Sequence, residues 1–123
     1  MNPKLIFTAL ATGIVAASLF AADILPTSEA RRQLAAGAKL VDVRTVEEYQ
    51  AKHLTNAVNI PVDTIKTGIT NCTLNKGQAI LLHCRTGRRS GIAENELRSI
   101  GYTNVFNIGS YEQAEAVVAP PTK

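Results

Sequence analysis

Apolar and polar residues follow one another along the chain in a pattern that predicts strands alternating with helices. Short apolar runs with the length and bulk of buried strands occupy residues 39–43, 57–60, 79–82 and 104–108. Segments expected to be helical lie around them, at residues 27–36, 46–52, 62–69, 90–100 and 111–118. This alternation favours an α/β fold, a small doubly wound parallel β-sheet with helices on both faces.

Polar residues set the expected starts of three helices. Thr27 or Ser28 is expected to cap the first helix, because both side chains can accept a hydrogen bond from a free N–H group. Thr45 and Ser90 are expected to cap two later helices for the same reason. Residues 71–77, which include a cysteine in a polar, turn-like context, are expected to form a loop.

The most informative stretch follows the apolar run at residues 79–82. Cys84 opens a short loop that contains a glycine and three arginines, and a helical pattern starts where the loop ends. The loop consists of Arg85, Thr86, Gly87, Arg88, Arg89 and Ser90. Because ligands of open α/β sheets bind beyond the carboxyl ends of the strands, this junction is the candidate binding site.

The composition of the loop favours ionisation of the Cys84 thiol. A free cysteine has a pKa near ~8.5, so only about 3% of it is thiolate at neutral pH. Lowering that pKa by about two units requires about 2.7 kcal/mol, whereas a helix N-terminus typically supplies ~0.3–1 kcal/mol. The three arginines and converging loop N–H groups are expected to supply the rest. The alternative is a buried structural cysteine beside a solvated basic turn.

The first residues resemble a secretory signal peptide rather than part of the domain. Lys4 forms a short positive region, residues 5–20 are uncharged and mostly apolar, and Ala21 and Ala22 follow. This pattern predicts cleavage after Ala21, which leaves residues 22–123 as one periplasmic domain with no membrane association. A retained membrane anchor is the alternative, but the apolar run is shorter than the ~20 residues that usually span a bilayer.

Charge and composition exclude other functions. The chain of 123 residues has a formal net charge of +3, and its basic residues are concentrated after Cys84. It has no basic stripe with interleaved aromatic residues, which disfavours nucleic-acid binding. No cluster of histidine, cysteine and carboxylate residues has metal-ligand spacing, so neither a metal nor another cofactor is expected.

The chain contains two cysteines, Cys72 and Cys84. A structural disulfide between them is one interpretation for a protein in an oxidising compartment. The place of Cys84 at the mouth of a basic loop argues against this disulfide, because a basic loop suits a reactive thiolate. A transient bridge that protects or resolves Cys84, and a Cys72 with no partner, are the other two interpretations.

Two segments together resemble the rhodanese family of single-domain sulfurtransferases, in particular its small periplasmic bacterial members. The first segment, residues 40–62, carries Asp-Val-Arg at 42–44, Glu-Tyr at 48–49, His-Leu at 53–54 and Asn-Ile-Pro at 59–61. The second, residues 84–89, matches the six-residue cysteine loop of the family. The chain departs at Lys52 and Asn56, where the family often has glycine, and a weaker match at residues 101–114 lacks the usual tryptophan.

The resemblance implies a rhodanese-like fold and thiosulfate sulfurtransferase activity. The Cys84 thiolate would take the outer sulfur of thiosulfate, and sulfite would leave. The acceptor of the resulting persulfide would be cyanide in an assay, and a thiol or a thiol-bearing partner protein in the cell. The loop amides from Arg85 to Ser90 would hold the persulfide. The arginines would attract the donor. Arg89 is the arginine most expected to point inward, followed by Arg85 and then Arg88.

Other polar residues near these motifs are assigned structural roles. Asp42 and Arg44 end a strand and are expected to hold the first motif together, with Glu48 as a further partner. His53 and His83 are not expected to be catalytic, because sulfur exchange at a thiolate of low pKa needs no general base. His83 is expected to face the interior.

Two alternatives to a sulfurtransferase remain. A cysteine-based phosphatase or arsenate reductase has a similar loop, but its arginine stands six positions after the cysteine, where this chain has Ser90. A loop one residue shorter suits a terminal sulfur better than a tetrahedral phosphate. A non-enzymatic persulfide carrier or redox partner module would need the same persulfide on Cys84 but no turnover.

Overall fold

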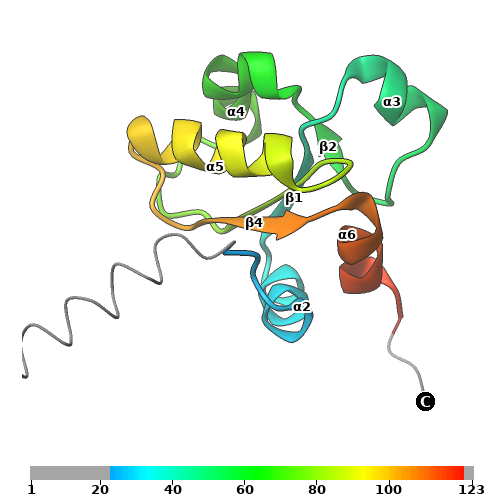
Figure 1. Ribbon diagram of the computed structural model, residues 1–123. Coiled ribbons are helices and arrows are strands. Elements are labelled where there is room, and N and C mark those ends of the chain that lie inside the picture. The colour runs from blue at the N-terminus through cyan, green and yellow to red at the C-terminus, as the bar shows by residue number, and fades with distance from the viewer. Residues whose placement is uncertain (1–22, 121–123) are drawn as a thin grey trace, which may run out of the picture.

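Four parallel strands form a sheet at the centre of the molecule (Figure 1). The structure is a computed structural model that describes residues 23–120. Its strands are β1 (Lys39–Asp42), β2 (Val58–Asn59), β3 (Ile80–His83) and β4 (Val105–Gly109). Their spatial order is β2-β1-β3-β4, and every neighbouring pair is parallel. The predicted parallel sheet is therefore confirmed.

Helices cover both faces of this sheet, as the sequence predicts. They are α2 (Thr27–Ala35), α3 (Val46–Ala51), α4 (Ile65–Cys72), α5 (Arg88–Ser99) and α6 (Tyr111–Val118), with a short 3₁₀ helix, η1 (Val62–Thr64), before α4. Helices α4 and α5 lie on one face, and α2 and α6 lie on the other (Figure 1). The fold is the doubly wound α/β arrangement.

The strands are buried on both sides because their successive side chains point to opposite faces. Val41 and Leu82 belong to the apolar cluster that α4 and α5 cover. Leu40 and Leu81, one position earlier in each strand, belong to the cluster that α2 and α6 cover. Burial on both faces explains why the strands read as unbroken apolar runs rather than as alternating ones.

The winding of the chain places a crevice at the carboxyl ends of β1 and β3. From β1 the chain moves outward to β2, whereas from β3 it moves outward in the opposite direction to β4. Ligands of doubly wound folds bind at such a reversal point. Arg44 follows β1 and Cys84 follows β3, so both residues lie at this point.

Two of the predicted helix caps are wrong and one is confirmed. The N-cap of α2 is Pro26, with no side-chain cap, so neither Thr27 nor Ser28 has that role. Helix α5 starts at Arg88 with Gly87 as its N-cap, which places Ser90 inside the first turn. Thr45 caps α3 as predicted, and its hydroxyl accepts a hydrogen bond from the Glu48 N–H.

The predicted element boundaries differ from the structure around β2 and α4. Strand β2 comprises two residues where four were predicted, because the chain leaves the sheet at Ile60 and Pro61. Helix α4 continues through Cys72, so the predicted loop starts two residues later than expected. Cys72 thus ends a helix and does not lie in a polar turn.

The predicted signal peptide, residues 1–21, lies outside the described residues. Within residues 23–120, no helix has the length and apolar character needed to cross a membrane.

Candidate active site

The loop after β3 is held in place by the start of α6. The Cys84 N–H donates to the Gly109 carbonyl at 3.2 Å, and the Tyr111 N–H donates to the Arg85 carbonyl at 3.3 Å. Thr86 forms an isolated antiparallel bridge with Ser110. The loop is therefore fixed on both sides of Arg85, before the chain enters α5.

Gly87 turns the loop into α5. Its φ of +99° lies in the left-handed region, which glycine adopts without the steric penalty of a side chain. A Cβ atom at this position would lie 3.4 Å from the Gly109 Cα. The turn directs the Gly87 N–H to the sulfur of Cys84, with an N–Sγ distance of 2.9 Å.

The environment of the Cys84 sulfur favours the thiolate. Burial alone would raise the pKa of the thiol, since Cys84 is fully buried. Hydrogen bonds from the Ser90 hydroxyl and from the N–H groups of Ser90, Gly87 and Thr86 outweigh that effect, so the pKa of Cys84 is lowered overall. The sequence suggested both the arginines and the loop N–H groups as the source of this effect, and the largest lowering effects come from the Ser90 hydroxyl and the loop N–H groups.

Asn107 is a site residue that the sequence did not single out. Its amide oxygen lies 2.7 Å from the Ser90 hydroxyl, and its amide nitrogen donates to the Gly87 carbonyl at 3.0 Å. It thereby joins β4 to both Gly87 and Ser90. A lone polar residue between Phe106 and Ile108, in an otherwise apolar strand, is the signal that could have revealed it.

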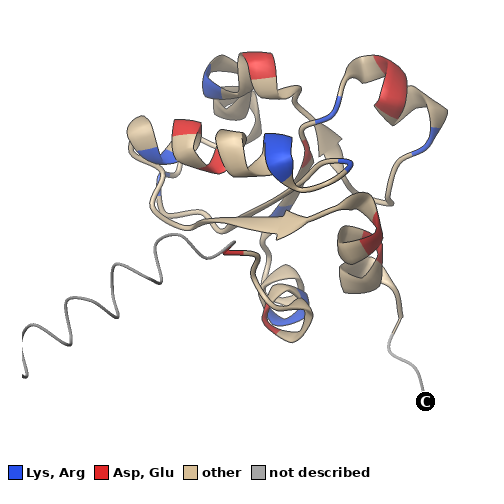
Figure 2. Cartoon of the chain, viewed as in Figure 1, with Lys and Arg blue, Asp and Glu red and all other residues tan. Residues whose placement is uncertain are grey.

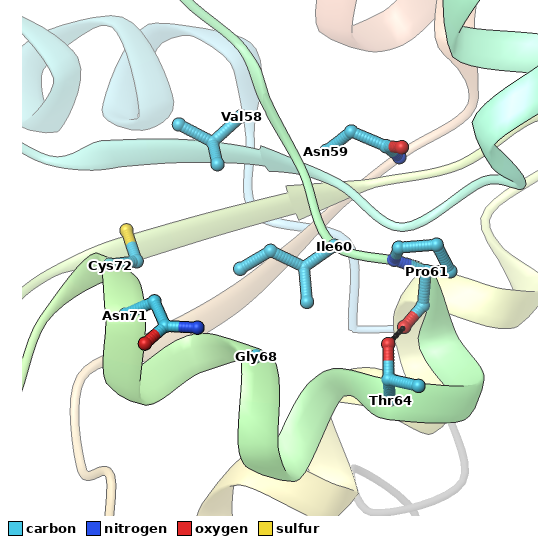
Figure 3. Close-up of a pocket in the computed structure, with 8 residues that line it drawn as sticks. All are labelled: Val58, Asn59, Ile60, Pro61, Thr64, Gly68, Asn71 and Cys72. Carbon is cyan, nitrogen blue, oxygen red and sulfur yellow. Dashed lines mark hydrogen bonds between the residues drawn. The ribbon is translucent and has the colours of Figure 1, made fainter.

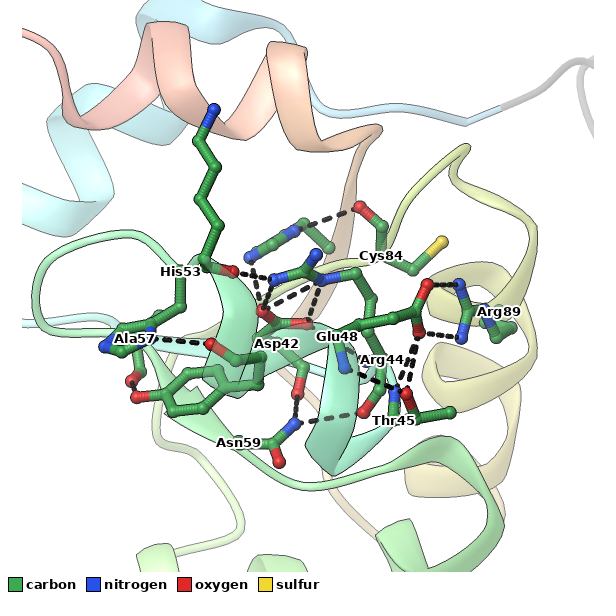
Figure 4. Close-up of polar contacts among 12 residues, drawn as sticks. Asp42, Arg44, Thr45, Glu48, His53, Ala57, Asn59, Cys84 and Arg89 are labelled. Carbon is green, nitrogen blue, oxygen red and sulfur yellow. Dashed lines mark hydrogen bonds and ion pairs between the residues drawn. The ribbon is translucent and has the colours of Figure 1, made fainter.

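Arg89 is anchored to α3 by an ion pair with Glu48 (Figure 4). The Arg89 Nη1–Glu48 Oε1 distance is 2.7 Å, and the second guanidinium nitrogen donates to Oε2 at 3.1 Å. This pair lowers the pKa of Glu48 to about 2, and a hydrogen bond from the Thr45 N–H contributes. Glu48 therefore pairs directly with Arg89 of the cysteine loop, and, after Asp42, its charge also raises the pKa of Arg44.

Asp42 and Arg44 form a buried pair at the end of β1 (Figure 4). The Arg44 Nη2 atom lies 2.7 Å from Asp42 Oδ2, and Arg44 also donates to the Lys52 carbonyl at 2.7 Å. The Asp42 carboxylate further accepts the Arg44 main-chain N–H at 3.0 Å. These contacts tie β1 to the segment after α3.

The loop side chains differ in exposure. Arg85, Thr86 and Arg88 are exposed, Gly87 and Arg89 are half-buried, and Ser90 is buried. Figure 2 shows basic residues in the loop and at the start of α5, and acidic residues on α3. Arg85 also lines a pocket of about 280 Å³ together with Arg44, Glu48 and Tyr111. Two of the three predicted arginines are thus free to meet an anion from solvent.

The two histidines lie away from the Cys84 sulfur. His83 is fully buried, as predicted, and its Nδ1 lies 3.1 Å from the Cys84 carbonyl oxygen. Burial lowers the pKa of His83, although the nearby Asp42 carboxylate, 3.7 Å from Nε2, opposes the shift. His53 is exposed and stacks on Tyr49 with ring centroids 3.9 Å apart.

Cys72 and Cys84 are both free thiols. Cys72 is half-buried at the end of α4, where it lines a separate pocket of about 280 Å³ with Ile60 and Gly68 (Figure 3). The structure therefore contains neither form of the Cys72–Cys84 bridge. Within residues 23–120, no group of three or more His, Cys, Asp or Glu side chains is arranged to hold a metal ion.

Fold and site together define a class of protein: a small parallel α/β domain with a cysteine in a loop of hydrogen-bond donors at the carboxyl end of the sheet. The model of the rhodanese-like domain family matches residues 26–116. The chain belongs to the rhodanese-like domain family.

Three similar proteins illustrate this membership. Thiosulfate sulfurtransferase PspE of Escherichia coli K12 is 39% identical over 69 residues, which are 56% of this chain and 66% of PspE. The putative sulfur carrier protein YrkF of Bacillus subtilis is 32% identical over 69 residues, 56% of this chain and 36% of YrkF. The chain thus spans less than two thirds of the length of these curated relatives. A solved E. coli rhodanese with anions is 34% identical, with a TM-score of 0.61, and covers 69% of this chain and 95% of its own.

Proposed function

We propose that the chain is a sulfurtransferase that carries sulfane sulfur as a persulfide on Cys84, with thiosulfate or a similar anion as the donor. The observation that carries this proposal is the buried Cys84 sulfur, 2.9 Å from the Gly87 N–H and surrounded by further donors. Such donors stabilise a negatively charged sulfur. Membership of the family, and the similarity to PspE and to a rhodanese with anions, support the same function.

In the first step the Cys84 thiolate attacks the outer sulfur of thiosulfate. A new S–S bond forms at Cys84, the S–S bond of thiosulfate breaks, and sulfite leaves with the electron pair. One negative charge on the thiolate and two on thiosulfate become one on the persulfide and two on sulfite. No proton moves, so the step needs no general base.

In the second step a thiophile attacks the terminal sulfur of the persulfide. Cyanide would give thiocyanate and regenerate the thiolate, and a thiol or a thiol-bearing partner protein would take the sulfur in the cell. The loop N–H groups that stabilise the thiolate would stabilise the terminal sulfur in the persulfide.

The arginines of the loop attract and hold the donor. Arg85 and Arg88 are exposed and make no ion pair among residues 23–120, so they are available to a dianion. The pKa of Arg89 is raised mainly by Glu48, and the charge of Cys84 contributes to a smaller extent. Because Glu48 holds Arg89, the exposed Arg85 and Arg88 are the first candidates for contact with the donor.

The loop argues against phosphate ester chemistry. Ser90 occupies the position where a phosphatase requires its arginine, and its hydroxyl is directed into the protein toward Asn107 and Cys84. Arg89, one position earlier, pairs with Glu48. No free guanidinium therefore stands at that position to bind a tetrahedral phosphate.

A persulfide carrier without turnover is the second candidate function, and the similarity to the putative sulfur carrier protein YrkF supports it. Both candidates require sulfur on Cys84. Steady-state thiosulfate:cyanide transfer separates them, because a carrier releases at most one sulfur per chain.

The decisive experiment for an enzyme is this turnover assay on three proteins. The wild type and Cys72→Ser are expected to form thiocyanate over many cycles, and Cys84→Ser is expected to form none. Turnover in the Cys84→Ser variant would overturn the assignment of Cys84, and a single cycle in the wild type would favour the carrier.

We also propose that the chain is exported to the periplasm and cleaved after Ala21. The support is the composition of the first 21 residues, with one lysine followed by an uncharged apolar run. The mass of the protein isolated from a periplasmic fraction tests this. A mass that matches residues 22–123 is expected, and an intact chain retained in the membrane would contradict the proposal.

A further inference from the structure

The hydroxyl of Ser90 lies between two acceptors but has only one proton. Its Oγ atom lies 3.5 Å from the Cys84 sulfur and 2.7 Å from the Asn107 Oδ1 atom. All three residues are buried, so water does not supply another donor. The proton of Ser90 can satisfy only one of these neighbours at a time.

The orientation of the Asn107 amide is fixed by the main chain. The Gly109 N–H donates to Oδ1 at 2.8 Å, and Nδ2 donates to the Gly87 carbonyl at 3.0 Å. A flipped amide would place two donors against each other at Gly109 and two acceptors against each other at Gly87. Oδ1 is therefore an acceptor, and the 2.7 Å contact with Ser90 requires the hydroxyl proton.

We propose that Asn107 is a positioning residue, which competes with Cys84 for the proton of the Ser90 hydroxyl. When Ser90 donates that proton to Asn107, its oxygen can only accept a hydrogen bond from the Cys84 thiol. While Cys84 is protonated, its S–H donates to Ser90, and Ser90 donates to Asn107. When the proton leaves Cys84, the Ser90 hydroxyl rotates toward the sulfur and gives up its short bond to Asn107. Asn107 thus limits how far Ser90 stabilises the thiolate.

The distances indicate that the Ser90 hydroxyl donates to Asn107 in preference to a neutral Cys84. An O–H···O contact of 2.7 Å has the usual length of a good hydrogen bond, whereas sulfur is a weaker acceptor and lies farther away. The shorter contact therefore takes the proton as long as Cys84 is neutral. Ionisation of Cys84 reverses the preference, because a charged acceptor forms the stronger hydrogen bond.

Removing the Asn107 side chain is expected to release the Ser90 proton to Cys84. The Asn107→Ala variant should then ionise Cys84 about half to one pH unit lower than the wild type, which is the size of one net hydrogen bond. In a Ser90→Ala background the same substitution should have no effect on the titration, because the group through which Asn107 acts is missing.

The test is a double-mutant cycle in a Cys72→Ser background, in which Cys84 is the only thiol. Thiolate absorbance near 240 nm, or the rate of alkylation by iodoacetamide, is measured against pH for the parent, Asn107→Ala, Ser90→Ala and the double variant. The charged and titratable groups around Cys84 stay the same in all four proteins: Asp42, Arg44, Glu48, His83, Arg85, Arg89 and Tyr111. Differences within the cycle therefore report on Ser90 and Asn107.

A lower titration midpoint in Asn107→Ala that disappears without Ser90 would support the proposal. An equal shift in both backgrounds would overturn it, since Asn107 would then act through Gly87 and the shape of the loop. No shift, or a higher midpoint in the presence of Ser90, would also overturn it. If Asn107→Ala does not fold, Asn107→Ser keeps a polar side chain in β4 that is too short to reach Ser90, and the same cycle applies. The measurement involves no sulfur transfer, so its failure is distinct from a failure of the proposed function.

Discussion

Gly87 connects the backbone of the loop to the chemistry of Cys84. Its positive φ turns the chain into α5 and also directs its N–H to the Cys84 sulfur at 2.9 Å. Any other residue at this position has a Cβ atom, which the left-handed conformation disfavours by about 1–2 kcal/mol. The reactivity of the sulfur therefore depends on a residue that has no side chain.

We predict that Gly87→Ala impairs both stability and reactivity. A residue with a Cβ atom is strained at the φ of +99° that Gly87 adopts, so relief of strain must move the N–H away from the sulfur. Loss of a hydrogen bond to a charged group should raise the pKa of Cys84 by one unit or more, which slows alkylation at neutral pH by about tenfold. Alkylation rates in a Cys72→Ser background measure this effect.

Gly77→Ala is the matched control, because Gly77 lies in a turn but does not have a positive φ, and an added Cβ would make only an ordinary contact at 3.5 Å. It should alkylate at the parent rate. A Gly87→Ala variant that also alkylates at the parent rate would show that the Gly87 N–H does not stabilise the thiolate.

Helix α3 contributes to the site through one carboxylate. Glu48 completes the capping box at Thr45 and, at the same time, holds the guanidinium of Arg89 on α5. A helix that follows β1 is thereby joined to the helix that follows the cysteine loop. Both helices start at the carboxyl edge of the sheet, which is why residues 41 positions apart in the chain can pair there.

We predict that Glu48→Gln destabilises the protein by about 1 kcal/mol at neutral pH, the size of a partly exposed ion pair. The pKa of Glu48 is lowered to about 2, so its contribution is fully present above the unfolded value near ~4.3 and is lost as the pH falls toward 2. Urea unfolding from pH 7 to pH 3 should therefore give wild-type and Glu48→Gln stabilities that converge on acidification.

Glu47→Gln provides the control for this series, because Glu47 is the exposed neighbour in the first turn of α3. Its free energy of unfolding should differ little from that of the wild type at any pH between 7 and 3. If the difference in unfolding free energy between the wild type and Glu48→Gln is the same at every pH, the ionised carboxylate is not the source of the stabilisation.

The stability of the whole domain depends on keeping His83 neutral. His83 is fully buried, its Nε2 atom makes no hydrogen bond, and burial lowers the pKa of the ring. The unfolded chain then binds a proton below about pH 6.5 that the folded chain does not bind, so acidification favours unfolding. The stabilisation is complete above that pH and decreases as the pH falls toward the lowered folded-state pKa.

We predict that the melting temperature of the wild type falls between pH 7.5 and pH 5, and that the melting temperature of His83→Gln falls less over the same interval. His53→Gln should retain the wild-type dependence, because His53 is exposed. Calorimetry at several pH values provides the comparison. Equal slopes for the wild type and His83→Gln would rule out His83 as the source of the acid sensitivity.

Much of the architecture could be predicted from the sequence because it depends on local patterns. Apolar runs predicted the four strands, and the capping residue Thr45 and the limits of α6 could be inferred from neighbouring residues. The predicted start of α5 at Ser90 was wrong, because the Ser90 side chain has other partners and does not cap the helix. Ser90 is turned inward to Cys84 and Asn107.

The contacts between distant segments could not be predicted in the same way. Ser90 and Asn107 are 17 positions apart and meet only because α5 packs beside β4. The partner of Glu48 likewise depends on the relative positions of α3 and α5. Sequence patterns predicted Cys84 and its loop as the candidate site, whereas the fold was needed to find the groups that contact them.

The central claim is that Cys84, stabilised by the donors of its loop, takes up sulfane sulfur. Intact mass spectrometry of the reduced protein before and after treatment with thiosulfate tests it directly. We predict a gain of one sulfur atom, ~32 Da, in the wild type and in Cys72→Ser, and no gain in Cys84→Ser. A wild-type protein that gains no mass from thiosulfate or any other sulfane donor, or a Cys84→Ser variant that still gains it, would contradict the account.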